Sequence, residues 1–164
     1  MEKIAQFEKV SYACFQAGFA GEDPKGVYDR IRLPKRATTG SAGYDFFLTQ
    51  NISLKPSETA LIPTGIRAKM EEGWVLMLFP RSGLGFKFRL QLNNTVGIID
   101  SDYYFSKNEG HIFCKITNDS KEGKTLELKE GEAFCQGIFL PFGITKDDET
   151  DGVRNGGFGS TDGK

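Results

Sequence analysis

The stretch Ala60-Leu-Ile-Pro-Thr-Gly-Ile-Arg-Ala-Lys-Met-Glu-Glu-Gly-Trp-Val-Leu-Met-Leu-Phe79 carries the clearest fold signal in this chain. An apolar run ends at a Pro-Thr-Gly turn, an alternating run follows over 66–70, and a Glu-Glu-Gly turn leads into an unbroken apolar run over 74–79. Alternation with a period of two indicates a strand with one buried face, and a short apolar run between turns is typical of a fully buried strand. We therefore expect consecutive β-strands joined by tight turns.

Similar runs continue on both sides of this stretch and are separated by polar or glycine-containing turns. They cover residues 52–54, 111–116, 125–128 and 133–140. No stretch keeps an apolar stripe at helical spacing for three turns, so we expect only short helices, within 10–19 and after Ser82. Many short strands with glycine turns are typical of a sandwich, jelly roll or barrel. Without a repeat or linker in 164 residues, we expect one β domain over 1–144 and a flexible C-terminal arm with a glycine-rich flap over 145–164.

Composition and charge argue against several classes of protein. The formal net charge is −1 with no basic stripe, which disfavours nucleic-acid binding. No segment reaches about 18 apolar residues, and the N-terminus lacks the apolar core of a signal peptide. Three widely spaced cysteines suit neither a disulfide framework nor a zinc site, so we expect buried thiols in a cytoplasmic protein. The single histidine, His111, rules out a histidine-cluster metal site and is expected at the surface or at a strand end.

The last eleven residues, Arg154 to Lys164, combine one arginine, one phenylalanine, two adjacent hydroxyls and four glycines. Glycine-rich backbone can turn its N–H groups toward an anion, and arginine can grip phosphate through two hydrogen bonds. Phe158 adds a flat apolar face that suits a base. The mixture favours a flap that closes over a nucleotide, the alternative being a disordered terminus.

Two internal segments place polar groups beside glycine turns. In 41–46, the carboxylate of Asp45 can orient a metal-bound water or simply cap the turn. In 80–85, Arg81 and Ser82 follow the apolar run and can present a guanidinium and backbone N–H groups to phosphate. An ordinary turn is the alternative there, and no Walker-type phosphate loop occurs in the chain.

A third segment, 94–103, joins groups that suit a nucleoside. The Asn94 amide carries a donor and an acceptor, which fits the edge of a pyrimidine, and Gly97 permits close backbone approach. Asp100 follows an apolar pair, so a partly buried carboxylate that takes a proton from water is a reasonable hypothesis. Tyr103 can pack against a sugar. The alternative is a hairpin with acidic turn residues.

Together these segments resemble the five ordered motifs of the trimeric dUTPase family, found here between Ser41 and Gly163, over about three quarters of the chain. The strongest matches are 80–85, 97–103 and 156–161. The resemblance implies a distorted jelly-roll (β-clip) fold with little helix, assembled as a homotrimer in which the C-terminal arm of one subunit closes the site of another. It also implies Mg²⁺-assisted hydrolysis of dUTP to dUMP and pyrophosphate, which keeps uracil out of DNA and supplies dUMP for thymidylate synthesis.

The resemblance further implies roles for individual residues. Asp100 would activate the attacking water, and Asp45 would lie near Mg²⁺, through water. Uracil and deoxyribose would be held by Asn94, Gly97, Tyr103 and Phe158. The phosphates would be held by Arg81, Ser82, Gly83, Gln136, Arg154, Gly159, Ser160 and Thr161.

This sequence departs from the family pattern at several points. Asp162 interrupts the fifth motif, Glu132 replaces a basic residue in the fourth, and the six residues 104–109 lengthen the hairpin after Tyr103. That hairpin is a candidate surface for a regulatory partner, in which case its removal would leave turnover nearly intact. Residues 2–25 match nothing in the family and are expected to form an edge strand or an inter-subunit contact. Two other functions remain open, a dCTP deaminase and a nucleotide-gated regulatory protein.

Overall fold

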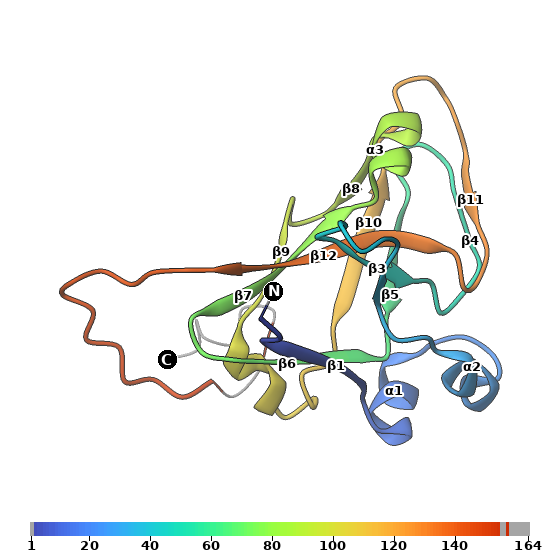
Figure 1. Cartoon of the computed structure of the whole chain (residues 1–164). Coiled ribbons are helices and arrows are strands. Elements are labelled where there is room, and N and C mark those ends of the chain that lie inside the picture. Colours follow the sequence, from blue (N-terminus) through green and yellow to red (C-terminus); the bar gives the residue numbers. More distant parts are fainter. Residues whose placement is uncertain (1, 155–156, 158–164) are drawn as a thin grey trace.

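The computed structural model describes residues 2–154 and 157, and short antiparallel strands dominate this part of the chain (Figure 1). The largest sheet has the order β2-β3-β12-β7-β9, with β2 at Lys35–Arg36, β3 at Tyr44–Phe47, β12 at Ala133–Pro141, β7 at Trp74–Pro80 and β9 at Gly97–Ile99. A second sheet has the order β5-β10-β8, with β5 at Thr59–Pro63, β10 at Phe113–Asn118 and β8 at Leu90–Leu92. Two further pairs are β11 (Leu126–Leu128) with β4 (Ile52–Leu54) and β1 (Ala5–Lys9) with β6 (Ile66–Met70).

The apolar run at Trp74 is the centre of the fold, as its pattern predicts. Strand β7 pairs with β12 along its full length, from Trp74 opposite Pro141 to Pro80 opposite Cys135. Side chains from both sheets fill the space between them, and those that are fully buried include Phe46, Ile62, Leu76, Leu78, Ile116 and Phe134. Burial of this apolar surface is the main stabilising contribution to the domain.

The strands expected at 52–54, 60–62, 66–70, 74–79, 125–128 and 133–140 are confirmed to within one or two residues. The strand expected at 111–116 is shifted and covers Phe113–Asn118 as β10. The shift arises because the two preceding residues serve other contacts. The backbone N–H of Ile112 donates to the carbonyl of Ile66, and the His111 ring accepts from Gly65.

Both expected short helices are present, α1 at Tyr12–Gly18 and α3 at Ser82–Phe88. A further helix, α2 at Pro24–Arg30, was not predicted. It begins at a recognisable signal, because Asp23 caps it by accepting from the N–H of Gly26 and Pro24 occupies its first turn. Its seven residues are too few for a clear helical periodicity.

The N-terminal region adds an edge strand and a small core of its own. Strand β1 pairs with β6 in the register Ala5 opposite Met70 to Lys9 opposite Ile66, which agrees with the edge strand expected from the sequence. Helices α1 and α2 lie against one another and bury Val10, Phe15 and Val27 in a second cluster. Figure 1 shows these two helices together at one end of the molecule, far from α3.

After β12 the chain leaves the sheet as an extended, exposed segment over 142–153 (Figure 1). This segment turns back toward the 3₁₀ helix η1 at Ser101–Phe105, where Arg154 and Gly157 contact the domain. The division into a domain over 1–144 and an arm over 145–164 stays a prediction. None of the helices in the described part of the chain has the length and apolar character needed to cross a bilayer.

Candidate active site

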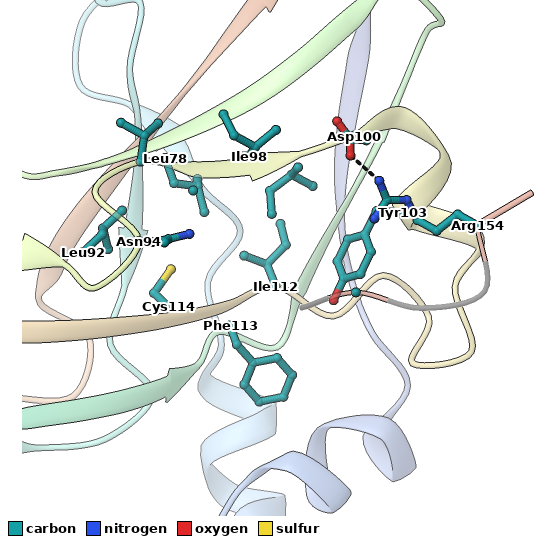
Figure 2. A pocket seen from close by; sticks show the side chains of 14 residues that line it. Leu78, Leu92, Asn94, Ile98, Asp100, Tyr103, Ile112, Phe113, Cys114 and Arg154 are labelled. Atoms are coloured by element: carbon teal, nitrogen blue, oxygen red, sulfur yellow. Dashed lines mark hydrogen bonds and ion pairs between the residues drawn. The ribbon is translucent and has the colours of Figure 1, made fainter. Parts of the chain in front are cut away.

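A cavity of about 210 Å³ lies beside β9, and it joins most residues of the third predicted segment. Its apolar walls come from strands β7 to β10 and the turn before β10: Leu78, Leu92, Ile98, Ile99, Ile112, Phe113 and Cys114. Asn94 reaches into it from one end, and Asp100, Tyr103 and Arg154 close the other end (Figure 2). An apolar cavity with a few convergent polar groups is the usual form of a small-molecule site.

The end of the cavity at Asn94 offers hydrogen-bonding groups beside a closely packed strand, and Asn94 itself is exposed. Asn94 lies in the turn between β8 and β9. Its backbone carbonyl accepts from the N–H of Val96, and Thr95 has a positive φ of 69°. Gly97 is buried opposite Leu78, and a Cβ at Gly97 would come within 3.0 Å of the Leu78 Cβ. The small residue therefore lets β9 pack tightly while its neighbour Asn94 presents an amide to a planar ligand.

The other end of the cavity carries a carboxylate paired with a guanidinium. Asp100 precedes η1 and is half-exposed, with Arg154 Nη2 on its Oδ2. The same guanidinium donates from Nε to Asp102 Oδ1 at 2.7 Å. Arg154 thus bridges Asp100, the N-cap of η1, and Asp102 in its first turn. The dashed line in Figure 2 marks the ion pair with Asp100.

Tyr103 lies beside Asp100 and Arg154 at this end of the cavity. Its side chain is buried, and its hydroxyl donates to the carbonyl of His111 at 2.7 Å while accepting from Asn108 Nδ2 at 2.8 Å. Burial raises the pKa of this phenol, and the hydrogen bond from Asn108 acts in the opposite direction. Gly157 of the tail lies against the ring, because a Cβ there would stand 2.5 Å from Tyr103 Cε2. The ring is therefore held in a neutral, fixed position.

The residues predicted to hold phosphate gather in a different place, an open cleft of about 900 Å³. Arg81 occupies the N-cap position of α3, and its Nε lies 3.4 Å from Asp45 Oδ1 on β3. Gln136 of β12 stands opposite Asp45 in the sheet register. Its side chain lies over Gly43, where a Cβ would come within 2.4 Å of Gln136 Oε1. Ser82 and Gly83 complete the cleft at the start of α3.

The two places are separate in a single chain. Among the described residues, none that lines the cavity also lines the cleft. The structure therefore brings together Asn94, Gly97, Asp100, Tyr103 and Arg154 in one set. It brings together Asp45, Arg81, Ser82, Gly83 and Gln136 in another. The remaining predicted residues, Phe158, Gly159, Ser160 and Thr161, lie outside the described residues, as does Asp162.

Asp45 is the one predicted site residue with a role toward a metal. Among residues 2–154 and 157, no group of three or more His, Cys, Asp or Glu side chains is arranged to hold an ion. Mg²⁺ is commonly held by one or two carboxylates, several waters and the substrate phosphates rather than by a full protein cage. A single half-buried carboxylate beside the guanidinium of Arg81 fits that pattern.

Two features of the site differ from the sequence-based interpretation. His111 is 1% exposed, so the surface alternative is wrong, whereas its position just before β10 agrees with the strand-end alternative. Its Nε2 accepts from the N–H of Gly65 at 2.9 Å. Burial lowers its pKa to about 4. Asp102 and Asn108, which contact Arg154 and Tyr103, were not predicted. The Asp-Ser-Asp spacing around Ser101 is a signal that could have found Asp102, whereas nothing local marks Asn108.

The mostly β fold, the cavity at Asn94 and the separate cleft at Arg81 together suit a protein that binds a nucleotide. The family model of dUTPase matches residues 29–162. A deoxyuridine 5′-triphosphate nucleotidohydrolase of Lactococcus lactis is 45% identical over 134 residues, which cover 80% of this chain and 88% of the relative. The chain belongs to the dUTPase family.

Solved structures agree with this assignment. The crystal structure of the dUTPase from Streptococcus mutans has a TM-score of 0.66 at 37% identity and covers 85% of this chain and 98% of its own. A mutant dUTPase from phage phi11 of S. aureus, described with a structural Mg(II) ion, shares the fold at 22% identity, with a TM-score of 0.66 and coverage of 92% and 98%. Residues 2–28 of this chain lie outside the family match.

Proposed function

We propose that this chain hydrolyses dUTP to dUMP and pyrophosphate with Mg²⁺, at sites formed where three copies meet. The observation that carries the proposal is the cavity at β9, where an amide, a carboxylate and a buried tyrosine face a space that suits a pyrimidine deoxynucleoside. The sequence similarity to deoxyuridine 5′-triphosphate nucleotidohydrolases over 80% of the chain supports it independently.

Base and sugar recognition follow from the two ends of the cavity. Asn94 offers a donor and an acceptor to the uracil edge, and a cytosine there would leave these groups unpaired. The apolar walls exclude water and strengthen each hydrogen bond. Tyr103 packs against the deoxyribose and leaves no room for a 2′-hydroxyl, because its ring is held from behind by His111 and Asn108.

Asp100 is the proposed general base. It removes a proton from a water whose oxygen attacks the α-phosphorus, while the bond from that phosphorus to the bridging oxygen breaks and pyrophosphate leaves with the electron pair. Arg154 pairs with Asp100 in this structure. A triphosphate offers the guanidinium a stronger bidentate partner, which would release the carboxylate for catalysis.

The phosphates and the metal are assigned to the open cleft. Arg81, Ser82, Gly83 and Gln136 bind the phosphate chain, with Ser160 and Thr161 of the tail on the terminal phosphate and Phe158 over uracil. Asp45 would hold Mg²⁺ through water, where its charge lies beside the phosphates. Bound there, the ion would neutralise charge that develops on the phosphate oxygens.

A homotrimer is proposed because the cavity and the cleft lie apart on one chain. One dUTP molecule needs both, so the cleft of one copy would face the cavity of another. The extended segment 142–153 has the exposure expected of an arm that reaches a third copy, where Arg154 would repeat the contact it makes here with Asp100. The proposed location is the cytoplasm, where the three free thiols would stay reduced.

The first test is pyrophosphate release with Mg²⁺ from dUTP, dCTP, dTTP and UTP in parallel. Release from dUTP alone is expected. Ammonia release from dCTP would instead indicate a deaminase, and dUTP binding without any product would indicate a regulatory protein.

The shared site has its own test, in which two inactive variants are mixed. Arg81→Ala removes the cleft arginine and Asp100→Asn removes the base, so neither homotrimer should turn over. Co-expressed variants should regain activity, because some sites would join an intact cleft from one copy to an intact cavity from another. A mixture that stays inactive despite forming trimers would show that each site belongs to one chain.

A further inference from the structure

The lengthened hairpin after Tyr103, residues 104–109, packs against the domain and does not stand free in solvent. The Tyr104 hydroxyl donates to Glu8 of β1 at 2.8 Å, and the Arg67 guanidinium lies over the Tyr104 ring. Asn108 and Glu109 contact Tyr103 and the N-terminal helix. The hairpin therefore has an internal role next to the proposed sugar site.

We infer that Asn108 is a positioning residue, which sets the orientation of Tyr103 and through it the discrimination between deoxyribonucleotide and ribonucleotide. The inference rests on the proposed sugar-packing role of Tyr103. A phenol hydroxyl can donate once, and here it donates to the His111 carbonyl at 2.7 Å. Asn108 Nδ2 donates to the same oxygen at 2.8 Å. These opposed hydrogen bonds fix both the depth and the rotation of the ring.

The turn itself aims the amide of Asn108 at the phenol. Asn108 Oδ1 accepts from the N–H of Gly110 at 3.2 Å, which orients the amide so that Nδ2 points to Tyr103. Gly110 has a φ of 72°, and a Cβ there would stand 2.7 Å from the Cα of Tyr104. Only glycine allows the turn to close this tightly against η1.

Helix α1 supports the same turn from the other side. The N–H of Ser11 donates to Glu109 Oε2 at 2.7 Å, and the Ser11 hydroxyl donates to Oε1. These hydrogen bonds lower the pKa of the Glu109 carboxyl, so it stays charged and continues to accept. Cys14 Sγ donates to the carbonyl of Asn108 at 3.1 Å. Ser11 and Cys14 precede the region matched by the family model, so an N-terminal extension holds the hairpin in place.

The consequence concerns specificity rather than the chemical step. Exclusion of a 2′-hydroxyl depends on close contact with the ring, and a small displacement of Tyr103 would admit the ribose. Asn108 touches neither the cavity nor the proposed phosphate cleft. Its direct contact with a residue that lines the cavity is the hydrogen bond to the Tyr103 hydroxyl.

The test compares kcat/KM for dUTP and UTP in four variants of the full-length enzyme. Asn108→Asp keeps the shape and the acceptor for Gly110 but replaces the donor to Tyr103 by an acceptor, so the phenol proton can go either to the new carboxylate or to the His111 carbonyl and the opposed pair of hydrogen bonds is lost. We expect it to lower the dUTP-to-UTP preference by about tenfold, the order expected for one buried hydrogen bond, mainly through KM. Lys107→Ala changes an exposed residue of the same turn and should leave the preference unchanged. Tyr103→Phe and the Tyr103→Phe/Asn108→Asp double variant complete a double-mutant cycle. Once Tyr103 has lost its hydroxyl, adding Asn108→Asp should change the dUTP-to-UTP preference little.

Thermal unfolding of each variant separates positioning from general destabilisation. A lower Tm with an unchanged preference in Asn108→Asp would overturn the inference and reduce Asn108 to a structural role. Tyr103→Ala tests the underlying proposal separately. If Tyr103→Ala relaxes the preference and Asn108→Asp does not, only the inference fails. If Tyr103→Ala leaves the preference intact, the sugar-packing role and the inference both fail.

Ser11→Ala provides an independent test, because it removes the hydroxyl that donates to Glu109 without touching Tyr103 or Asn108, and leaves the backbone N–H donor in place. We expect a smaller loss of preference in the same direction. An unchanged preference in Ser11→Ala would overturn the part of the inference that assigns the N-terminal extension to substrate discrimination.

Discussion

The guanidinium of Arg154 lies on the carboxylate of Asp100, 54 positions earlier in the chain, and also holds Asp102. This contact brings the tail to the cavity at the point where the proposed general base stands. Two acidic side chains that share one cation form a site that a triphosphate can compete for, because a phosphate group offers arginine the same bidentate geometry.

Replacement of Asp100 by Asn should abolish turnover while leaving dUTP binding measurable. The amide keeps the size of the side chain but cannot take a proton, and loss of a general base typically lowers rates by about 10²- to 10⁴-fold. Pyrophosphate release measures the rate, and calorimetric titration with dUTP measures binding. Asp102→Asn is the matched control, because it removes only an ion pair with Arg154 and should cost less than tenfold. Turnover retained in Asp100→Asn would refute the assignment of the base.

Truncation before Arg154 should cripple catalysis without unfolding the domain. The segment 142–153 is exposed and contributes little to the core, so the Tm should change little. The rate should fall because the flap and Arg154 are lost together. Single-turnover kinetics and thermal unfolding of the same sample check both statements. An unchanged rate would exclude the tail from the site.

Gly157→Ala should slow turnover without lowering stability. A methyl group at Gly157 would stand 2.5 Å from the Tyr103 ring, which cannot move aside because two hydrogen bonds hold its hydroxyl. The tail would then close less completely. Gly152→Ala is the control, since a Cβ there meets nothing within 4 Å. Equal rates for the two variants would contradict the tail position seen here.

The domain should lose stability as the pH falls from about 6.5 toward 4, because His111 is buried in its neutral form. Its pKa in the folded chain is lowered from 6.5 to about 4. Within this window the unfolded chain binds the proton and the folded chain does not, so acidification favours unfolding. The full shift corresponds to about 3 kcal/mol.

Urea unfolding of the wild type and His111→Gln across this pH range tests the assignment. The glutamine amide can still accept from Gly65 but does not titrate. The variant should therefore lack the part of the pH dependence that His111 contributes. Identical slopes in both proteins would show that another group is responsible.

Deletion of residues 104–109 is expected to impair discrimination against UTP, contrary to the tolerance expected for a partner-binding rim. The deletion removes the Tyr104–Glu8 contact and the Asn108 donor to Tyr103 in one step. The same parallel assay with dUTP and UTP measures the effect. Wild-type kinetics in the deletion variant would instead support the hypothesis that the hairpin is only a surface for a regulatory partner.

Local patterns in the chain were sufficient for most of the strands and for the candidate residues. Periodicity of two and unbroken apolar runs depend on neighbouring residues alone, so β6 and β7 could be predicted from 66–79. Short ordered motifs likewise placed Asp45, Arg81 and Asp100 among the candidate site residues, because each motif lies within a few consecutive positions. Helix α2 was missed although Asp23 and Pro24 mark its start.

Tertiary structure determined how these pieces meet. The separation of the Asn94 cavity from the Arg81 cleft, the burial of His111 against Gly65, and the hold of Asn108 on Tyr103 all depend on how distant elements pack. Such contacts leave no periodic trace, because the partners come from different elements and each side chain alone suits a surface turn equally well. Packing density and the pairing of most buried polar groups selected among these local alternatives.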